Sequence, residues 1–164
     1  MREARLKLLQ EMPIFGGMRV DILGFLLDLT RIVTKQKNEF FFRENDEADS
    51  MFVLEKGRVA VLKDWRGRDY HLAELRYGDC FGEMAVMDLG PRAGSVLALE
   101  YCSAIEISTT NLYEIYQKDL EQFTIIQMNM GREISRRLRA AQQRLFASKQ
   151  EAPTVDGNRT FRST

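Results

Sequence analysis

Residues Phe81–Val96 read FGEMAVMDLGPRAGSV, and the interpretation of the whole chain starts from this stretch. It contains one glutamate, Glu83, and one arginine, Arg92, and the arginine is followed directly by the small residues Ala-Gly-Ser. Pro91 fixes the backbone just before the arginine. None of the small residues can block the close approach of a ligand, so the stretch predicts a site for one small anion.

Length and composition indicate a single soluble domain. The chain has 164 residues, with 24 Lys+Arg balanced by 24 Asp+Glu. This balance argues against a broad nucleic-acid-binding or anionic-membrane-binding surface. Two cysteines and one histidine give neither a zinc cluster nor a disulfide framework, so we expect a reduced, cytoplasmic setting. The charged N-terminus lacks a signal core, and no apolar run approaches the roughly 20 residues that span a bilayer.

The residue patterns predict two helices, then a β-roll, then two more helices. The first two are expected at 2–12 and 19–29, with Ile14 and Phe15 turned inward between them. Short β-branched and aromatic runs then recur at about 8–12-residue spacing, which is typical of an antiparallel sandwich or barrel. The fold class is therefore α+β, mainly β, with a cupin-like jelly roll. The expected strands are 31–34, 39–43, 51–56, 58–64, 71–75, 95–100 and 103–107.

Helical periodicity returns after the strands. Asn111 and Glu114 are spaced as a capping pair for a short helix ending near Gln117. Asp119 is a suitable N-cap for a long helix reaching about Ser148. The apolar stripe of this helix has a mean spacing of about 3.67 residues, which suits a straight helix better than a left-handed heptad seam. Its members are Phe123, Ile126, Met130, Ile134, Leu138, Ala141 and Leu145. Residues 149–164 are expected to form a disordered tail.

The run from Phe42 to Ile107 resembles the cyclic nucleotide-binding domain of the catabolite activator protein, protein kinase A regulatory subunits and cyclic nucleotide-gated channels. The segments that carry the resemblance are FFRENDEADSMFVLEKGRVAVL, LAELRYGDCFGEMAVMDLGPRAGSV and ALEYCSAIEIS. Residues at the family's marked positions are Gly57, Gly78, Phe81, Gly82, Glu83, Ala85, Arg92 and Ala93. With flanking helices the resemblance covers about 5–147. It implies one such domain over 1–148, with the β-roll at about 31–108 and the long helix at about 119–148.

The resemblance implies a role for each residue of the motif. Arg92 would give forked hydrogen bonds to the cyclic phosphate, and Ala85 and Ala93 would offer backbone N–H groups beside it. A helical turn at 83–88 would point its first amides toward the anion. Glu83 would accept a hydrogen bond from the ribose 2′-hydroxyl. The alternative is an internal salt bridge between Glu83 and Arg92. The ligand contacts expected are Phe81, Gly82, Glu83, Met84, Ala85, Arg92, Ala93, Ser95 and Gln142.

The expected ligand is cAMP rather than cGMP. Members of the family that prefer cGMP commonly carry Thr directly after the phosphate arginine, whereas this chain has Ala93. In the catabolite activator protein, polar residues of the long helix touch the adenine. The matching stretch here is about 139–143, where Gln142 is the best substitute. A merely solvated Gln142 is the open alternative.

These features together predict a non-catalytic cAMP sensor whose C-terminal helix closes over the base and shifts a two-state equilibrium. No nucleophile, base, metal or cofactor constellation supports an enzyme. The roughly 16 residues that follow Ser148 are too few for a recognition helix, so a cAMP-responsive transcription factor is an alternative only if the chain is truncated. A regulatory module for a separate kinase, channel or other effector is another, and a protein-interaction module with a decayed pocket is a third. A homodimer through Ile126–Leu145 remains open. The C-terminal helix also has an arginine-rich face, which is expected to be solvated, with dimer contacts or partner docking as the alternatives; its members are Arg132, Arg136, Arg137, Arg139 and Arg144.

Overall fold

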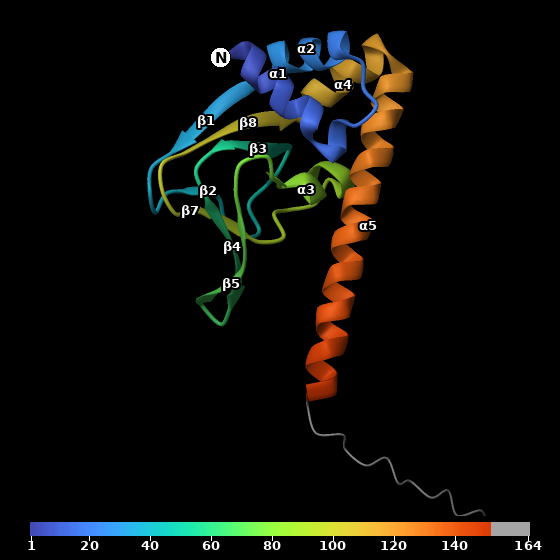
Figure 1. Ribbon diagram of the computed structural model, residues 1–164. Coiled ribbons are helices and arrows are strands. Elements are labelled where there is room, and N and C mark those ends of the chain that lie inside the picture. The colour runs from blue at the N-terminus through green and yellow to red at the C-terminus, as the bar shows by residue number, and fades with distance from the viewer. Residues whose placement is uncertain (152–164) are drawn as a thin grey trace, which may run out of the picture.

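The structure, a computed structural model, describes residues 1–151 (Figure 1). Most of the predicted disordered tail therefore lies outside the described residues. The long helix extends to Glu151 rather than ending near Ser148. Among the described residues, no helix combines the length and the apolarity needed to cross a bilayer.

Two antiparallel four-stranded sheets form a mainly β jelly roll, as the strand spacing predicted. The first sheet has the order β1-β8-β3-β6, and the second has the order β2-β7-β4-β5. The strands of the first are β1 (Arg31–Lys35), β8 (Cys102–Ser108), β3 (Ser50–Lys56) and β6 (Cys80–Phe81). Those of the second are β2 (Phe40–Phe42), β7 (Ser95–Ala98), β4 (Val59–Trp65) and β5 (Arg68–Leu75).

Three strands differ from the prediction by more than one residue, and one of them, β7, ends at Ala98 rather than at residue 100. Strand β6 was not predicted because two residues show no periodicity; it pairs with β3, where Phe81 lies opposite Phe52. Strand β5 begins three residues earlier than expected. The β4–β5 turn contains only Arg66 and Gly67, both at positive φ, which is the conformation a two-residue hairpin requires.

The helices gather at one end of the roll. They are α1 (Arg2–Glu11), the 3₁₀ turn η1 (Pro13–Phe15), α2 (Val20–Leu29), α4 (Thr109–Lys118) and α5 (Leu120–Glu151), while the short α3 (Glu83–Asp88) lies between the roll and α5 (Figure 1). Helices α1, α2, α4 and the first part of α5 lie beside the sheet containing β1, β8 and β3 (Figure 1). Ile14 and Phe15 are buried among them, as predicted. A second apolar cluster fills the roll and includes Phe52 and Phe81, whose rings stack with centroids 5.2 Å apart.

Local signals define the two C-terminal helices. Helix α4 is capped by Ser108, not Asn111, because Asn111 occupies the third helical position and bonds back to the Ser108 N–H. The side chain of Asp119 accepts a hydrogen bond from the Gln122 N–H at 3.1 Å, which confirms it as the cap of α5. The apolar stripe of α5 packs only in its first half. Met130 is fully buried, whereas Leu138 and Leu145 are more than half exposed.

Candidate functional site

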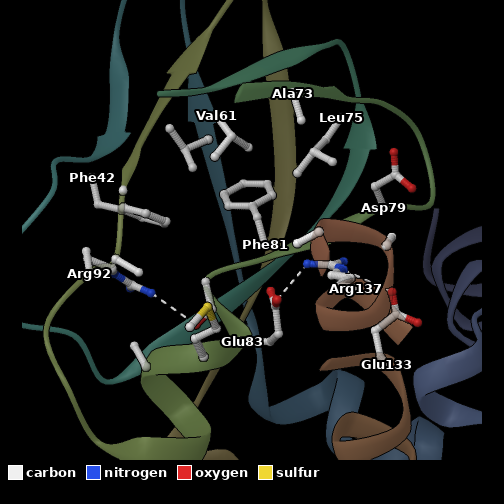
Figure 2. Close-up of a pocket in the computed structure, with 18 of the residues that line it drawn as sticks. Phe42, Val61, Ala73, Leu75, Asp79, Phe81, Glu83, Arg92, Glu133 and Arg137 are labelled. Atoms are coloured by element: carbon white, nitrogen blue, oxygen red, sulfur yellow. Dashed lines mark hydrogen bonds and ion pairs between the residues drawn. The ribbon is translucent and has the colours of Figure 1, made fainter. Parts of the chain in front are cut away.

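A cavity of about 430 Å³ lies between the β-roll, the segment around α3 and the middle of α5 (Figure 2). Its volume falls within the range typical of small-molecule sites. Strands β2, β4, β5 and β7 supply an apolar wall through Phe42, Val61, Ala73, Leu75 and Val96. The remaining lining comes from two loops, β6, α3 and α5: Asp79, Phe81, Gly82, Glu83, Met84, Ala85, Arg92, Ala93, Gly94, Glu133, Arg137, Ala140, Ala141 and Arg144.

Gly82 allows the two halves of the sequence motif to approach each other. It caps α3 with φ of 79°, a left-handed conformation that favours glycine. A Cβ at this position would lie 2.5 Å from Nη1 of Arg92, which is far inside van der Waals contact. The glycine is therefore needed both for its backbone conformation and for the space that the guanidinium occupies.

Arg92 is a buried cation without an anionic partner. Only 5% of the residue is exposed, and among residues 1–151 no carboxylate lies within ion-pair distance of it. Its Nη1 donates to the backbone carbonyls of Ser50 and Gly82, and its Nη2 donates to Ser50 Oγ at 3.2 Å. The guanidinium carbon lies 4.0 Å from the ring centroid of Phe42, and Nε has no partner in the described residues.

Burial lowers the pKa of the Arg92 guanidinium, and the nearby charges of Asp49, Glu106 and Asp46 offset only part of this effect. A buried charge is costly unless it is paired. Partners for Arg92 in the described chain are neutral, so an anion entering the cavity would supply what the protein does not.

Glu83 is also buried, but its partner is Arg137 on α5 rather than Arg92. Nη1 of Arg137 donates to Glu83 Oε1 at 2.6 Å (Figure 2). The internal Glu83–Arg92 salt bridge considered from the sequence is therefore wrong. Arg137 also donates from Nη2 to the Cys80 carbonyl at 3.1 Å and from Nε to Glu133 Oε1 at 3.0 Å.

The pKa values of this cluster follow from the same contacts. Burial acts to lower the pKa of Arg137, but the charges of Glu83 and Glu133 outweigh it, and the net shift is upward. Burial acts to raise the pKa of Glu133, but hydrogen bonds and charge from Arg136 and Arg137 lower it overall. Arg137 and Glu133 are thus held ionised, and Arg137 connects α5 directly to the Glu83 side chain on α3.

Seven of the nine predicted ligand contacts line this cavity: Phe81, Gly82, Glu83, Met84, Ala85, Arg92 and Ala93. Ser95 does not line it, because its Oγ accepts a hydrogen bond from the Glu44 N–H at 2.8 Å. Gln142 is exposed on α5, whereas its neighbours Ala140 and Ala141 line the cavity. The assignment of all nine as ligand contacts stays a prediction, and the geometry gives no support to Ser95 or Gln142.

Arg137 was not predicted as a site residue but as a member of the arginine-rich face of the C-terminal helix. The available signal was weak. Arg137 follows Glu133 by four residues, a spacing typical of a surface ion pair, and such a pair gives no hint of Glu83. Glu83 lies 54 positions away, so their contact depends on how α5 crosses the roll.

The chain is similar in sequence to a known domain family and to a longer protein that contains such a domain. The family model for the cyclic nucleotide-binding domain matches residues 32–119. The cGMP-dependent protein kinase 2 of Homo sapiens is 27% identical over 138 residues, which are 79% of this chain and 18% of the kinase. The chain thus spans less than a fifth of that relative.

Two solved structures share the architecture. A cyclic nucleotide-binding domain from Methylobacillus flagellatus aligns with a TM-score of 0.79 and 20% identity, covering 90% of this chain and 83% of that one. The regulatory domain of Toxoplasma gondii PKA, crystallised with cAMP, aligns with a TM-score of 0.69 and 20% identity, covering 82% and 50%. At these identities the likeness shows the fold.

Proposed function

Because this chain belongs to the cyclic nucleotide-binding domain family, we propose that its cavity binds cAMP and that binding shifts α5. The observation that carries the proposal is the buried guanidinium of Arg92, whose hydrogen-bond partners among residues 1–151 are all neutral. A cyclic phosphodiester has one negative charge and two free oxygens, which suit the forked donors of arginine. Backbone N–H groups at the start of α3, including that of Ala85, have no intrahelical partner and would add donors for the same oxygens.

Glu83 is proposed to accept the ribose 2′-hydroxyl and to transmit binding to α5. In the described state Arg137 holds Oε1 of this carboxylate. A hydroxyl arriving at Glu83 competes with Arg137 or reorients it, and Arg137 belongs to α5. The ligand therefore has different contact free energies with the two positions of the helix, which is the requirement for shifting a two-state equilibrium.

The preference for adenine rests on Ala93 and on the apolar wall beside it. Ala93 lines the cavity and has no hydroxyl to offer a guanine amino group. Val61, Ala73 and Leu75 present only apolar side chains. The Homo sapiens kinase is named for cGMP, whereas the Toxoplasma gondii domain was crystallised with cAMP, so relatives of both types occur. The absence of a hydroxyl at Ala93 favours cAMP here.

The proposed role is regulatory rather than catalytic, in a cytoplasmic protein that acts on a separate kinase, channel or other effector. A cAMP-responsive transcription factor would use the same cavity and differ only in its output. Homodimerisation through α5 is supported by the exposed side chains of Leu138, Leu145 and Phe146 on its second half. Sedimentation with and without cAMP tests the homodimer, and a monomer in both conditions would contradict dimerisation through α5.

Calorimetric titration tests the ligand. We expect wild type to bind cAMP more tightly than cGMP and to bind cyclic dinucleotides poorly. Arg92→Ala should weaken cAMP binding by about 2–5 kcal/mol, the scale for truncating one partner of a buried charge pair. Arg132→Ala is the matched control on α5, since Arg132 bonds only to Asn129 among the described contacts. Absence of binding of any cyclic mononucleotide to wild type would refute the proposal, and a cGMP affinity equal to or tighter than that of cAMP would overturn the base preference.

A further inference from the structure

The loop that carries Arg92 is held from outside the cavity by the segment that follows β2. The Arg92 N–H donates to the Asp46 carbonyl at 2.9 Å, and the Asn45 N–H donates to the Arg92 carbonyl at 2.9 Å. A peptide unit is planar and trans, so its N–H points opposite to its C=O. The Asn45 bond therefore turns the N–H of Ala93 away from the β2–β3 segment.

A side-chain clasp fixes the next peptide unit of the same loop. The ammonium of Lys63 on β4 donates to the Ala93 carbonyl at 2.8 Å and forms an ion pair with Glu44 Oε1. The other carboxylate oxygen of Glu44 accepts from the Asp64 N–H at 2.8 Å. The backbone N–H of Glu44 donates to Ser95 Oγ at 2.8 Å. We call Glu44 and Lys63 the clasp.

Building on the proposed cyclic nucleotide function, we propose that Glu44 and Lys63 are positioning residues of its phosphate site. Neither side chain lines the cavity, so they act through the loop rather than by touching the ligand. The clasp joins three segments: the residues after β2, the outer half of β4 and the loop from Arg92 to Ser95. It holds Ala93 in the orientation in which its N–H is available to an anion.

Several features separate the clasp from an ordinary surface ion pair, which contributes little to stability. The carboxylate of Glu44 is mostly covered, although the Lys63 side chain is about half exposed. Both oxygens of Glu44 bond to β4, at Lys63 and at Asp64, and its backbone N–H bonds to Ser95 at the end of the Arg92 loop. The ammonium bond from Lys63 lowers the pKa of Glu44, helped by the Asp64 N–H, so the carboxylate is charged at neutral pH. Glu44 and Lys63 neutralise each other, which leaves geometry as their main influence on the anion.

The clasp also explains Ser95, which the sequence motif placed among the ligand contacts. Its hydroxyl is 2.8 Å from the Glu44 nitrogen and is buried outside the cavity lining. We assign it to the same support, where it anchors the end of the loop to Glu44.

Titration calorimetry of the full chain with cAMP tests the proposal. Lys63→Met should raise the Kd about tenfold, the effect of losing one or two hydrogen bonds that orient the loop. Lys63→Arg keeps both the donor and the charge and should restore binding to within about threefold of wild type. Arg58→Met is the matched control, because Arg58 precedes the same strand, is similarly exposed and forms ion pairs with Glu74 and Glu100.

Two further measurements separate positioning from general destabilisation. The melting temperature of the ligand-free Lys63→Met protein should equal that of the Arg58→Met control within a few degrees. The factor lost should be the same for cAMP and 2′-deoxy-cAMP, because the clasp acts on the phosphate end. If Lys63→Met does not fold, the Kd of Glu44→Gln for cAMP tests the proposal instead, and it should also be higher than that of wild type. If Lys63→Met does fold, adding Glu44→Gln to it should raise the Kd little further, since the two residues act as one unit.

The outcomes distinguish this inference from the function on which it rests. Wild type that fails to bind cAMP contradicts the proposed function. Wild type that binds while both Lys63→Met and Glu44→Gln bind within twofold of it leaves that function intact and overturns the clasp. A loss of the same size in Arg58→Met would also overturn it.

Discussion

Replacing Arg92 by Met should remove ligand binding while costing the ligand-free protein less stability than breaking a buried ion pair would. The residue is 5% exposed, yet its partners among the described residues are two backbone carbonyls and one hydroxyl rather than a carboxylate. A methionine can occupy the space beside the rings of Phe42 and Phe52 and make favourable sulfur–aromatic contacts there.

The expected magnitude comes from two opposing effects. Each hydrogen bond to a charged donor contributes about 1.5–3 kcal/mol, and Met forms none of them. Burying an ion costs several kcal/mol, and Met avoids that cost. The free energy of unfolding should therefore change by less than about 2 kcal/mol. Breaking an ordinary buried ion pair costs about 3–5 kcal/mol. The melting temperature should accordingly move by less than about 8 °C, at about 2–4 °C per kcal/mol for a chain of this size.

Scanning calorimetry with and without cAMP provides the measurement. At a free ligand concentration 100 times the Kd, wild type should gain about 2.7 kcal/mol of stability from binding. Arg92→Met should gain none. A variant that loses more than about 3 kcal/mol without ligand and is still stabilised by cAMP would show that Arg92 is a structural residue. That result would refute the assignment of Arg92 as the phosphate anchor.

Three other results follow from the structure. 2′-Deoxy-cAMP should bind wild type roughly 5- to 150-fold more weakly than cAMP, because the Glu83 carboxylate loses a hydrogen-bond partner worth about 1–3 kcal/mol. Equal affinities in calorimetry would contradict the role of Glu83 as the acceptor of the 2′-hydroxyl. Burial raises the pKa of the Cys80 thiol to about 12, above its value of about 9 when unfolded. Its contribution to stability is therefore complete below pH 9 and is lost as the pH rises from 9 toward 12. Urea unfolding between pH 8 and 11 should show that Cys80→Ala loses less free energy of unfolding than wild type as the pH rises. Equal losses in the two proteins would contradict the contribution assigned to the Cys80 thiol. Asp119→Ala should lower the free energy of unfolding by about 1 kcal/mol because it removes the cap of α5, whereas Asp119→Asn should retain most of the cap's contribution. Equal losses of stability for the two variants in urea unfolding would exclude a capping role.

The strand framework and the centre of the site were predictable because their signals are local. β-Branched residues and turn residues recur at strand spacing, and the Gly82-Glu83 and Pro91-Arg92 pairs lie within one short segment. Asp119 was recognisable for the same reason, since a cap depends on residues next to it. These features need no knowledge of which distant segments meet.

Features that depend on tertiary contact were not predictable. Arg137 gives no local sign that it reaches Glu83, because the contact is made by two segments 54 residues apart. Ser95 occupies the motif position expected of a ligand contact, but the segment after β2 uses its hydroxyl instead. The second half of the α5 stripe continues the apolar period, although nothing in the described chain covers Leu138 and Leu145. Periodicity shows which face is apolar and not what it packs against.

A crystal structure of the protein saturated with cAMP would show directly whether Arg92 holds the phosphate. We expect a nucleotide in the cavity beside α3, with phosphate oxygens within hydrogen-bond distance of the Arg92 guanidinium and the 2′-hydroxyl on Glu83. Arg137 should have moved relative to its 2.6 Å contact with Glu83. An occupied nucleotide whose phosphate lies away from Arg92, or a saturated protein whose cavity holds no nucleotide, would contradict the account.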